Sequence, residues 1–75
     1  MGEFVEYVAK KLVSEPDEVK VDEYESGRQI IVELTVAAGD MGKVIGRQGR
    51  TAKAFRTLLK AMATKRGERA VLEIV

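Results

Sequence analysis

Two glycines, Gly46 and Gly49, stand three residues apart and enclose one basic and one amide side chain, Arg47 and Gln48. Glycine has no Cβ, so it adopts positive φ readily and lets another molecule approach the main chain closely. An amphipathic pattern follows Gly49, and the unpaired N–H groups at the start of such a helix favour an anion. The types and spacing of these residues therefore predict a backbone cradle for a phosphodiester.

Basic residues surround the two glycines and follow them along the chain. Residues 43–66 contain eight Lys or Arg and no acid, whereas residues 1–42 contain four Lys or Arg and ten acids. Such a run can be a solvated helix face, but this one coincides with the glycine pair. Its like charges repel one another unless a polyanion shares the surface. We interpret residues 43–66 as part of a surface for nucleic acid.

Length and composition limit the class of protein. The chain has 75 residues, of which 45% are hydrophobic and 33% charged, as expected for one small folded unit over residues 1–75. No apolar run approaches the roughly 18 residues that span a bilayer, and the first residues lack the pattern of a signal peptide. We therefore expect a cytoplasmic protein.

Cysteine and histidine are both absent. Their absence removes thiol chemistry, disulfides, histidine general bases and the usual zinc ligands, so we expect no enzyme, cofactor or metal site. A nucleotide-binding phosphate loop is the nearest enzymatic alternative, because Gly42 precedes Lys43. That pattern fails, since Ala37 occupies the place of its first glycine and Val44 the place of its Ser or Thr.

Two helices must flank the glycine pair to position it. Asp40 is a predicted N-cap for a short helix that ends at Gly46, with Met41, Val44 and Ile45 facing inward. A long helix is predicted from about residue 50 to 66, with Gly67 as its stop. Its predicted buried stripe is Thr51, Phe55, Leu58, Leu59 and Met62.

The remaining segments predict an α+β fold. Periodicity indicates a helix over residues 3–14, with Phe4 in the core and the role of Tyr7 left open. Strands are predicted near residues 19–24 and 29–36, as an antiparallel hairpin, and again over residues 69–75. The connection through two helices favours a parallel return of the last strand. The result is a three-stranded mixed sheet with helices packed on one face, in the order α-β-β-α-α-β.

The stretch from Val44 to Arg50 resembles the signature of the K-homology (KH) domain, in which an apolar pair precedes a Gly-x-x-Gly loop between two helices. That loop clamps four nucleotides of a single strand in KH domains. The additional helix and strand lie before the motif, so the order resembles the type II version of the fold. A bare Gly-x-x-Gly is a weak pattern, but this one lies between two helices in the matching element order.

The whole chain is similar to the small bacterial KhpA family. The similarity lies in residues 42–50, in Ala52-Lys53-Ala54 and in the opening helix that ends at Glu15-Pro16-Asp17. The resemblance implies an RNA-binding protein, an RNA chaperone or post-transcriptional regulator. It also implies a homodimer or a pair with a larger KH-containing protein of the KhpB (Jag) type.

We expect single-stranded RNA to pass Gly46 and Gly49. Arg47 and the Gln48 amide are expected to contact its phosphates or sugars. Only 5% of the chain is aromatic, so recognition should depend on shape more than on stacking. The other expected interface residues are Lys43, Arg50, Lys53 and Arg56 as surrounding cations, and Val44 and Ile45 with a sheet edge near residues 31–35 as an apolar floor and wall.

A protein-protein adaptor with weak or no nucleic-acid binding is the alternative reading. Apolar residues expected on the surface, such as Ile31, Val71 and Val75, and the small size of the chain would both suit a dimer. The two glycines would then form an ordinary connection between helices, for which one glycine suffices. RNA binding and dimerisation do not exclude each other.

Overall fold

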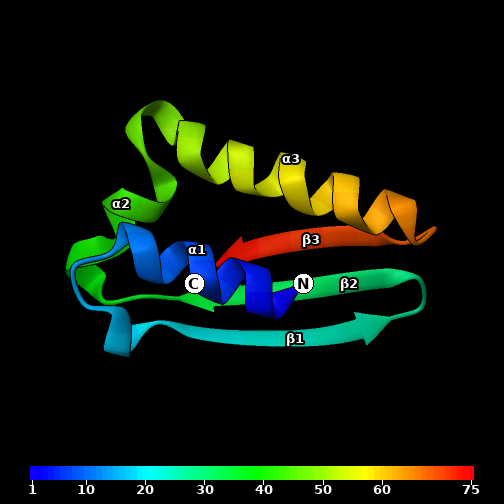
Figure 1. The fold of residues 1–75 in the computed structure, drawn as a ribbon, viewed down its shortest axis with the longest axis horizontal. Helices are drawn as coiled ribbons and strands as arrows, with labels where there is room; N and C mark the ends of the chain where they lie inside the picture. Colours follow the sequence, from blue (N-terminus) through cyan, green and yellow to red (C-terminus); the bar gives the residue numbers. More distant parts are fainter.

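Three strands and three α-helices make up the computed structural model, which describes residues 1–75 (Figure 1). Short 3₁₀ turns at Pro16–Glu18, Ala38–Asp40 and Arg47–Gly49 lie between them. The elements are α1 (Gly2–Leu12), β1 (Lys20–Ser26), β2 (Gln29–Thr35), α2 (Met41–Ile45), α3 (Arg50–Lys65) and β3 (Arg69–Ile74). The predicted elements are all present, and none of their ends differs from the prediction by more than two residues.

The strands form one sheet in the order β1, β2, β3. A turn at Gly27 and Arg28 lets β1 pair antiparallel with β2, and Gly27 has the positive φ of 64° that this turn requires. After two helices the chain returns as β3, which pairs parallel with β2. The mixed sheet and the element order confirm the predicted α+β fold and match the type II KH fold.

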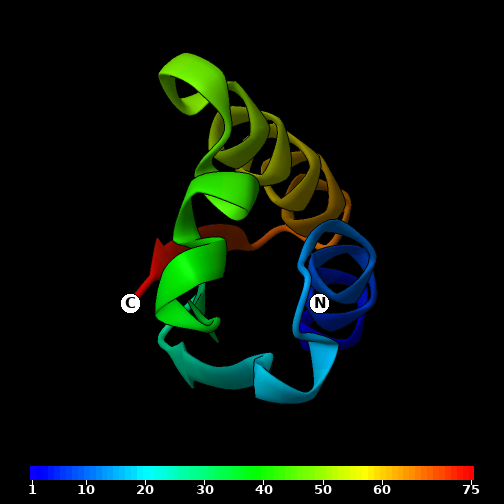
Figure 2. The same cartoon turned by 90° about the vertical axis from the view of Figure 1, so that its left-hand side faces the viewer.

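The core lies between the sheet and the helices. Helix α1 lies across β1 and β2, and α3 lies over β3 (Figures 1 and 2). Alternation along β2 points every second side chain into this layer, whereas Tyr24 on the opposite face is exposed. The core consists of Val5, Ala9, Ile30, Val32, Leu34, Val36, Val44, Phe55, Leu59 and Leu72. No helix combines the length and the apolar character needed to cross a membrane.

The buried stripe of α3 is rotated from the predicted one. Phe55 and Leu59 are buried as predicted, but the prediction for Leu58 is wrong, because its side chain is 52% exposed. The small residues Ala52 and Ala63 are buried instead. They let α3 approach its neighbours closely, and this orientation turns Leu58 toward the margin of the helix that faces α1.

Candidate nucleic-acid interface

The connection between α2 and α3 projects away from the sheet (Figure 1). Gly46 ends α2 with φ 79° and ψ 172°, and Gly49 precedes α3 with φ 73° and ψ 14°. Both glycines therefore occupy conformations that other residues avoid, as the sequence predicted. Arg47 and Gln48 between them are exposed. The loop is open to solvent and is not covered by another part of the chain.

Gln48 is the only non-glycine residue with positive φ, at 57°. A left-handed conformation of this kind costs roughly 1–2 kcal/mol, and strain of this type gathers at functional sites. The Gln48 side-chain oxygen accepts a hydrogen bond from Arg50 Nη2 at 3.3 Å. This contact uses the amide oxygen of Gln48 and leaves its NH₂ group able to donate to another acceptor.

The two glycines differ in what surrounds them. A Cβ added at Gly46 would lie 2.9 Å from the Thr51 main-chain nitrogen and closer still to the Thr51 side chain. A Cβ added at Gly49 would meet no atom within 4 Å. Gly46 is therefore required for packing within the loop itself, whereas Gly49 leaves open space beside the main chain that another molecule can enter.

The basic residues of this region are largely without ion pairs. Lys43 is the only cation among residues 43–66 that has a carboxylate within ion-pair distance. Nothing in the chain neutralises the others, so their field extends into solvent and attracts anions. The cations without a partner are Arg47, Arg50, Lys53, Arg56, Lys60, Lys65 and Arg66.

Lys43 has a different environment from the other predicted cations. Its Nζ lies 3.4 Å from Asp40 Oδ1 and also contacts the Ser14 hydroxyl. Asp40 offsets part of its charge and draws the side chain toward the end of α1. The structure therefore places Lys43 near the loop but not among the free cations around it.

Asp40 is the one buried charged residue, with 3% of its surface exposed. It occupies the N-cap position of α2, as predicted, but its side chain makes no capping hydrogen bond to that helix. Its two oxygens accept the N–H groups of Ser14 at 3.1 Å and Glu15 at 3.0 Å. These N–H groups, together with Lys43, lower the pKa of Asp40. The carboxylate thus joins the end of α1 to the start of α2 and fixes the base of the loop.

Helix α3 has two unlike flanks. At about 100° per residue, Lys53, Arg56 and Lys60 fall on one exposed flank, and Lys60 lines a hollow together with Arg69 of β3. The opposite flank meets α1 across an apolar groove of about 160 Å³. This groove is lined by Phe4, Val8, Leu12, Thr51, Ala54, Phe55 and Leu58. The cations therefore form a line along one side of α3 that starts beside the loop.

The predicted apolar floor and wall need two corrections. Val44 has 0% exposure and belongs to the core, so only Ile45, which is 37% exposed, offers apolar surface beside the loop. The segment 31–35 lies in β2, which is paired on both sides and is not a sheet edge. The free edge next to α3 belongs to β3, which pairs with β2 alone. The periodicity of the strands in the sequence does not show which strand lies at the edge of the sheet, so this free edge could not have been predicted from it.

Comparison with known proteins gives consistent matches over the whole chain. The family model described as the KH domain of KhpA/KhpB matches residues 2–74. Relatives named RNA-binding protein KhpA from Caldanaerobacter subterraneus and Clostridium acetobutylicum are each 55% identical over 75 residues, with 100% of both chains covered. A relative of the same name from Chlamydia trachomatis is 49% identical and is covered over 96% of its length. No solved structure matches this chain significantly.

Proposed function

This chain belongs to the KhpA/KhpB family of KH-domain proteins, and from that premise we propose that it binds single-stranded RNA at the loop between α2 and α3. The names of its relatives support RNA as the ligand. The observation that carries the proposal is the loop itself. It combines positive φ at Gly46, Gln48 and Gly49 with exposed polar side chains and with cations that no carboxylate neutralises.

The sugar-phosphate backbone passes Gly49, where no side chain fills the adjacent space. Arg47 and the Gln48 amide donate hydrogen bonds to phosphate or sugar oxygens. Arg50 holds the Gln48 oxygen, which orients the amide before the ligand arrives. Because the loop already has its strained conformation, binding does not have to order it.

The strand then follows α3. Lys53 and Arg56 attract its phosphates from the cationic flank, and Lys43 adds a weaker contribution because Asp40 shares its charge. The bases turn toward Ile45 and the free edge of β3, where unpaired main-chain groups can hydrogen-bond with them. Val44 supports Ile45 from within the core. Selectivity is modest in this arrangement, since no exposed aromatic residue lies beside the loop.

The experiment that tests this proposal is the double variant Arg47→Asp and Gln48→Asp. Repulsion of the phosphates should lower the affinity for single-stranded RNA by more than about tenfold at low salt. The matched control is Lys20→Asp and Ser26→Asp, which changes the net charge equally on the exposed strand β1. Both variants should retain wild-type circular dichroism. Equal affinity of the folded loop variant and the control in a shift assay would refute the proposal.

We further propose that the protein acts as an RNA chaperone or post-transcriptional regulator, in the cytoplasm, as a homodimer or with a larger KH-containing partner of the KhpB type. The support for a partner is the apolar groove between α1 and α3, beside which Leu12 and Leu58 remain exposed. Native mass spectrometry of wild type and Leu58→Ser, with and without RNA, tests it. If both proteins were monomers at micromolar concentration, with and without RNA, the groove would not have this role.

A further inference from the structure

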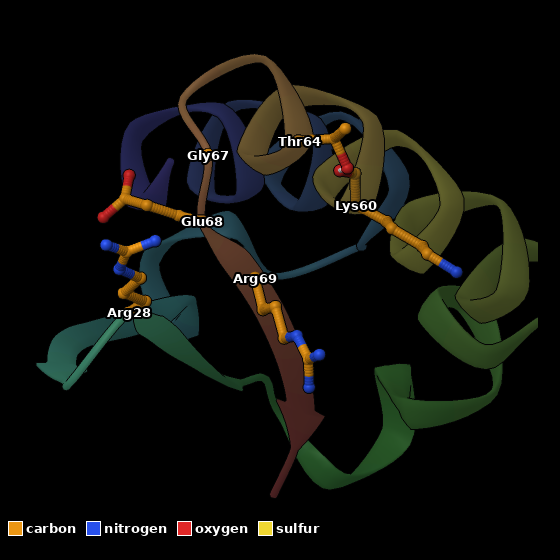
Figure 3. A pocket seen from close by; sticks show the side chains of 6 residues that line it. All are labelled: Arg28, Lys60, Thr64, Gly67, Glu68 and Arg69. Carbon is orange, nitrogen blue, oxygen red and sulfur yellow. Dashed lines mark hydrogen bonds between the residues drawn. The ribbon is translucent and has the colours of Figure 1, made fainter.

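The largest hollow in the structure lies at the end of α3 that is remote from the glycine loop (Figure 3). Its volume is about 710 Å³ and no hydrophobic side chain lines it. A second hollow of about 370 Å³ shares Arg28 and Arg69 with it. The residues that line the larger hollow are Arg28, Lys60, Thr64, Gly67, Glu68 and Arg69.

The charges in this hollow favour an anion. Arg28, Lys60 and Arg69 have no carboxylate within ion-pair distance, and Glu68 is the only acid in the lining. Figure 3 shows the side chains of Glu68 and Arg28 near one another on one side of β3, whereas Lys60 and Arg69 project on the other side. The uncompensated positive charge is therefore concentrated at Lys60 and Arg69.

Main-chain hydrogen bonds hold the two turns that form the hollow. Gly67, with φ 70°, ends α3 in a Schellman-type turn, in which the Glu68 N–H donates to the Ala63 carbonyl at 2.9 Å. The Arg69 N–H donates to the Arg28 carbonyl at 2.9 Å, which joins this turn to the β1–β2 hairpin. The main chain that presents Arg69 is thus fixed before any ligand binds.

Lys60 also belongs to the cationic flank of α3. It follows Lys53 and Arg56 at helical spacing, and it stands eleven residues beyond Gly49, about 16 Å along the helix axis. The cations therefore continue without interruption from the loop to the hollow. An RNA strand that is bound at the loop and follows this flank reaches Lys60 and Arg69 within a few nucleotides.

We propose that Lys60 and Arg69 bind a second phosphate of the RNA strand that the glycine loop holds, so that the strand is fixed at both ends of α3. This inference rests on the function proposed for the loop. The chemistry recognised is that of a phosphate group, which inorganic phosphate also offers. The hollow is open and its cations are exposed, so it holds a free anion weakly. Attachment of the strand at the loop raises the effective concentration of the second phosphate.

The test measures affinity for oligouridines from three to ten nucleotides with wild type and with the double variant Lys60→Gln and Arg69→Gln. The affinity ratio of wild type to variant should be one for the shortest strand and rise to several-fold for the longest. The dependence of log affinity on log salt for the longest strand should become shallower by about 0.7, since each neutralised phosphate of a single strand contributes about 0.7. The control Lys11→Gln and Lys20→Gln removes the same charge outside the hollow and outside residues 43–66, and it should leave the ratio near one at every length.

Three outcomes would overturn the inference. The Lys60 and Arg69 variant could bind every length as wild type does, or it could lose no more affinity than the control. Alternatively, inorganic phosphate could shift the amide resonances of Gly67 and Arg69 saturably while RNA length has no effect, which would make the hollow a site for a free anion. Failure of the loop proposal is recognised separately, because the Arg47→Asp and Gln48→Asp variant would then bind the shortest strands as wild type does.

Discussion

The charged residues at the two ends of α2 have opposite environments. At its start, Asp40 is buried, and two main-chain N–H groups and Lys43 satisfy its carboxylate. At its end, Arg47 and Gln48 are exposed in a strained loop whose cations have no acidic partner. The helix between the two environments has only five residues. The polar groups at the start of α2 stabilise the fold, whereas those at its end remain available to a ligand.

This contrast explains how so short a helix can present a ligand site. A five-residue helix has little stability of its own, because nucleation of a helix is unfavourable. Asp40 joins it to α1, and Val44 inserts into the core, so the loop stands on a fixed base. The loop can then keep unsatisfied groups and positive φ values without unfolding its surroundings.

The substitution Asp40→Ala should have the largest effect on stability. It leaves the N–H groups of Ser14 and Glu15 without their acceptor, which should cost about 4 kcal/mol, and we expect the melting temperature to fall by roughly 20 °C. The exposed Asp17, which makes no side-chain hydrogen bond, provides the matched control Asp17→Ala. If the two variants melted together, Asp40 would not hold the base of the loop.

The two glycines should differ in their tolerance of a methyl group. Gly46→Ala combines a conformation that is open almost only to glycine with a clash against Thr51, and should cost about 3 kcal/mol of unfolding free energy. Gly49→Ala adds its Cβ to open space in a left-handed conformation, and should cost about 1 kcal/mol. Urea unfolding gives both values. RNA affinity should nevertheless fall for Gly49→Ala, because its Cβ occupies the proposed path of the strand.

Acid should weaken the start of α2. Ser14, Glu15 and Lys43 lower the pKa of Asp40 in the folded protein, in that order of contribution apart from the opposing effect of burial. Its contribution to stability is therefore complete above the ordinary aspartate pKa of about 3.9 and is lost as pH falls through the folded value. The melting temperature of Asp40→Asn should depend less on pH below about 4 than that of wild type. A residual dependence is expected from Glu23, whose pKa the Gly2 N–H lowers.

Local sequence patterns predicted the loop better than its surroundings. The positive φ of Gly46 and Gly49 and the alternation along β2 follow from residue types within a few positions, and both are confirmed. The hydrogen bond that the Ser14 N–H donates to Asp40 joins residues 26 positions apart, so no local sequence pattern predicts it. Asp40 has the side chain and the position of an N-cap for α2, but in the folded chain its carboxylate binds main-chain N–H groups just after α1.

The errors in the predicted site have the same origin. Helical spacing gives the relative directions of Leu58 and Leu59 but not the absolute rotation of α3, which the small residues Ala52 and Ala63 determine through close packing. Strand periodicity predicted three strands but not which of them is central. The predicted free edge was in β2, whereas β2 is the central strand and the free edge next to α3 belongs to β3. The hollow at Arg69 was missed because its cations come from three separate segments.

The smallest expected effect concerns two cations near the loop, Lys43 and Arg50, which should contribute differently to RNA binding. Both are exposed cations near the loop, yet Lys43 Nζ lies 3.4 Å from Asp40, whereas Arg50 contacts only the neutral Gln48. A phosphate that displaced Asp40 from Lys43 would gain one contact and break another, so Lys43→Gln should leave the salt dependence of RNA binding nearly unchanged. Arg50→Gln removes the same charge without such compensation and should make the slope shallower by about 0.7. Equal slopes for the two variants would mean that the position of a cation, and not its partner within the fold, decides its contribution to RNA binding.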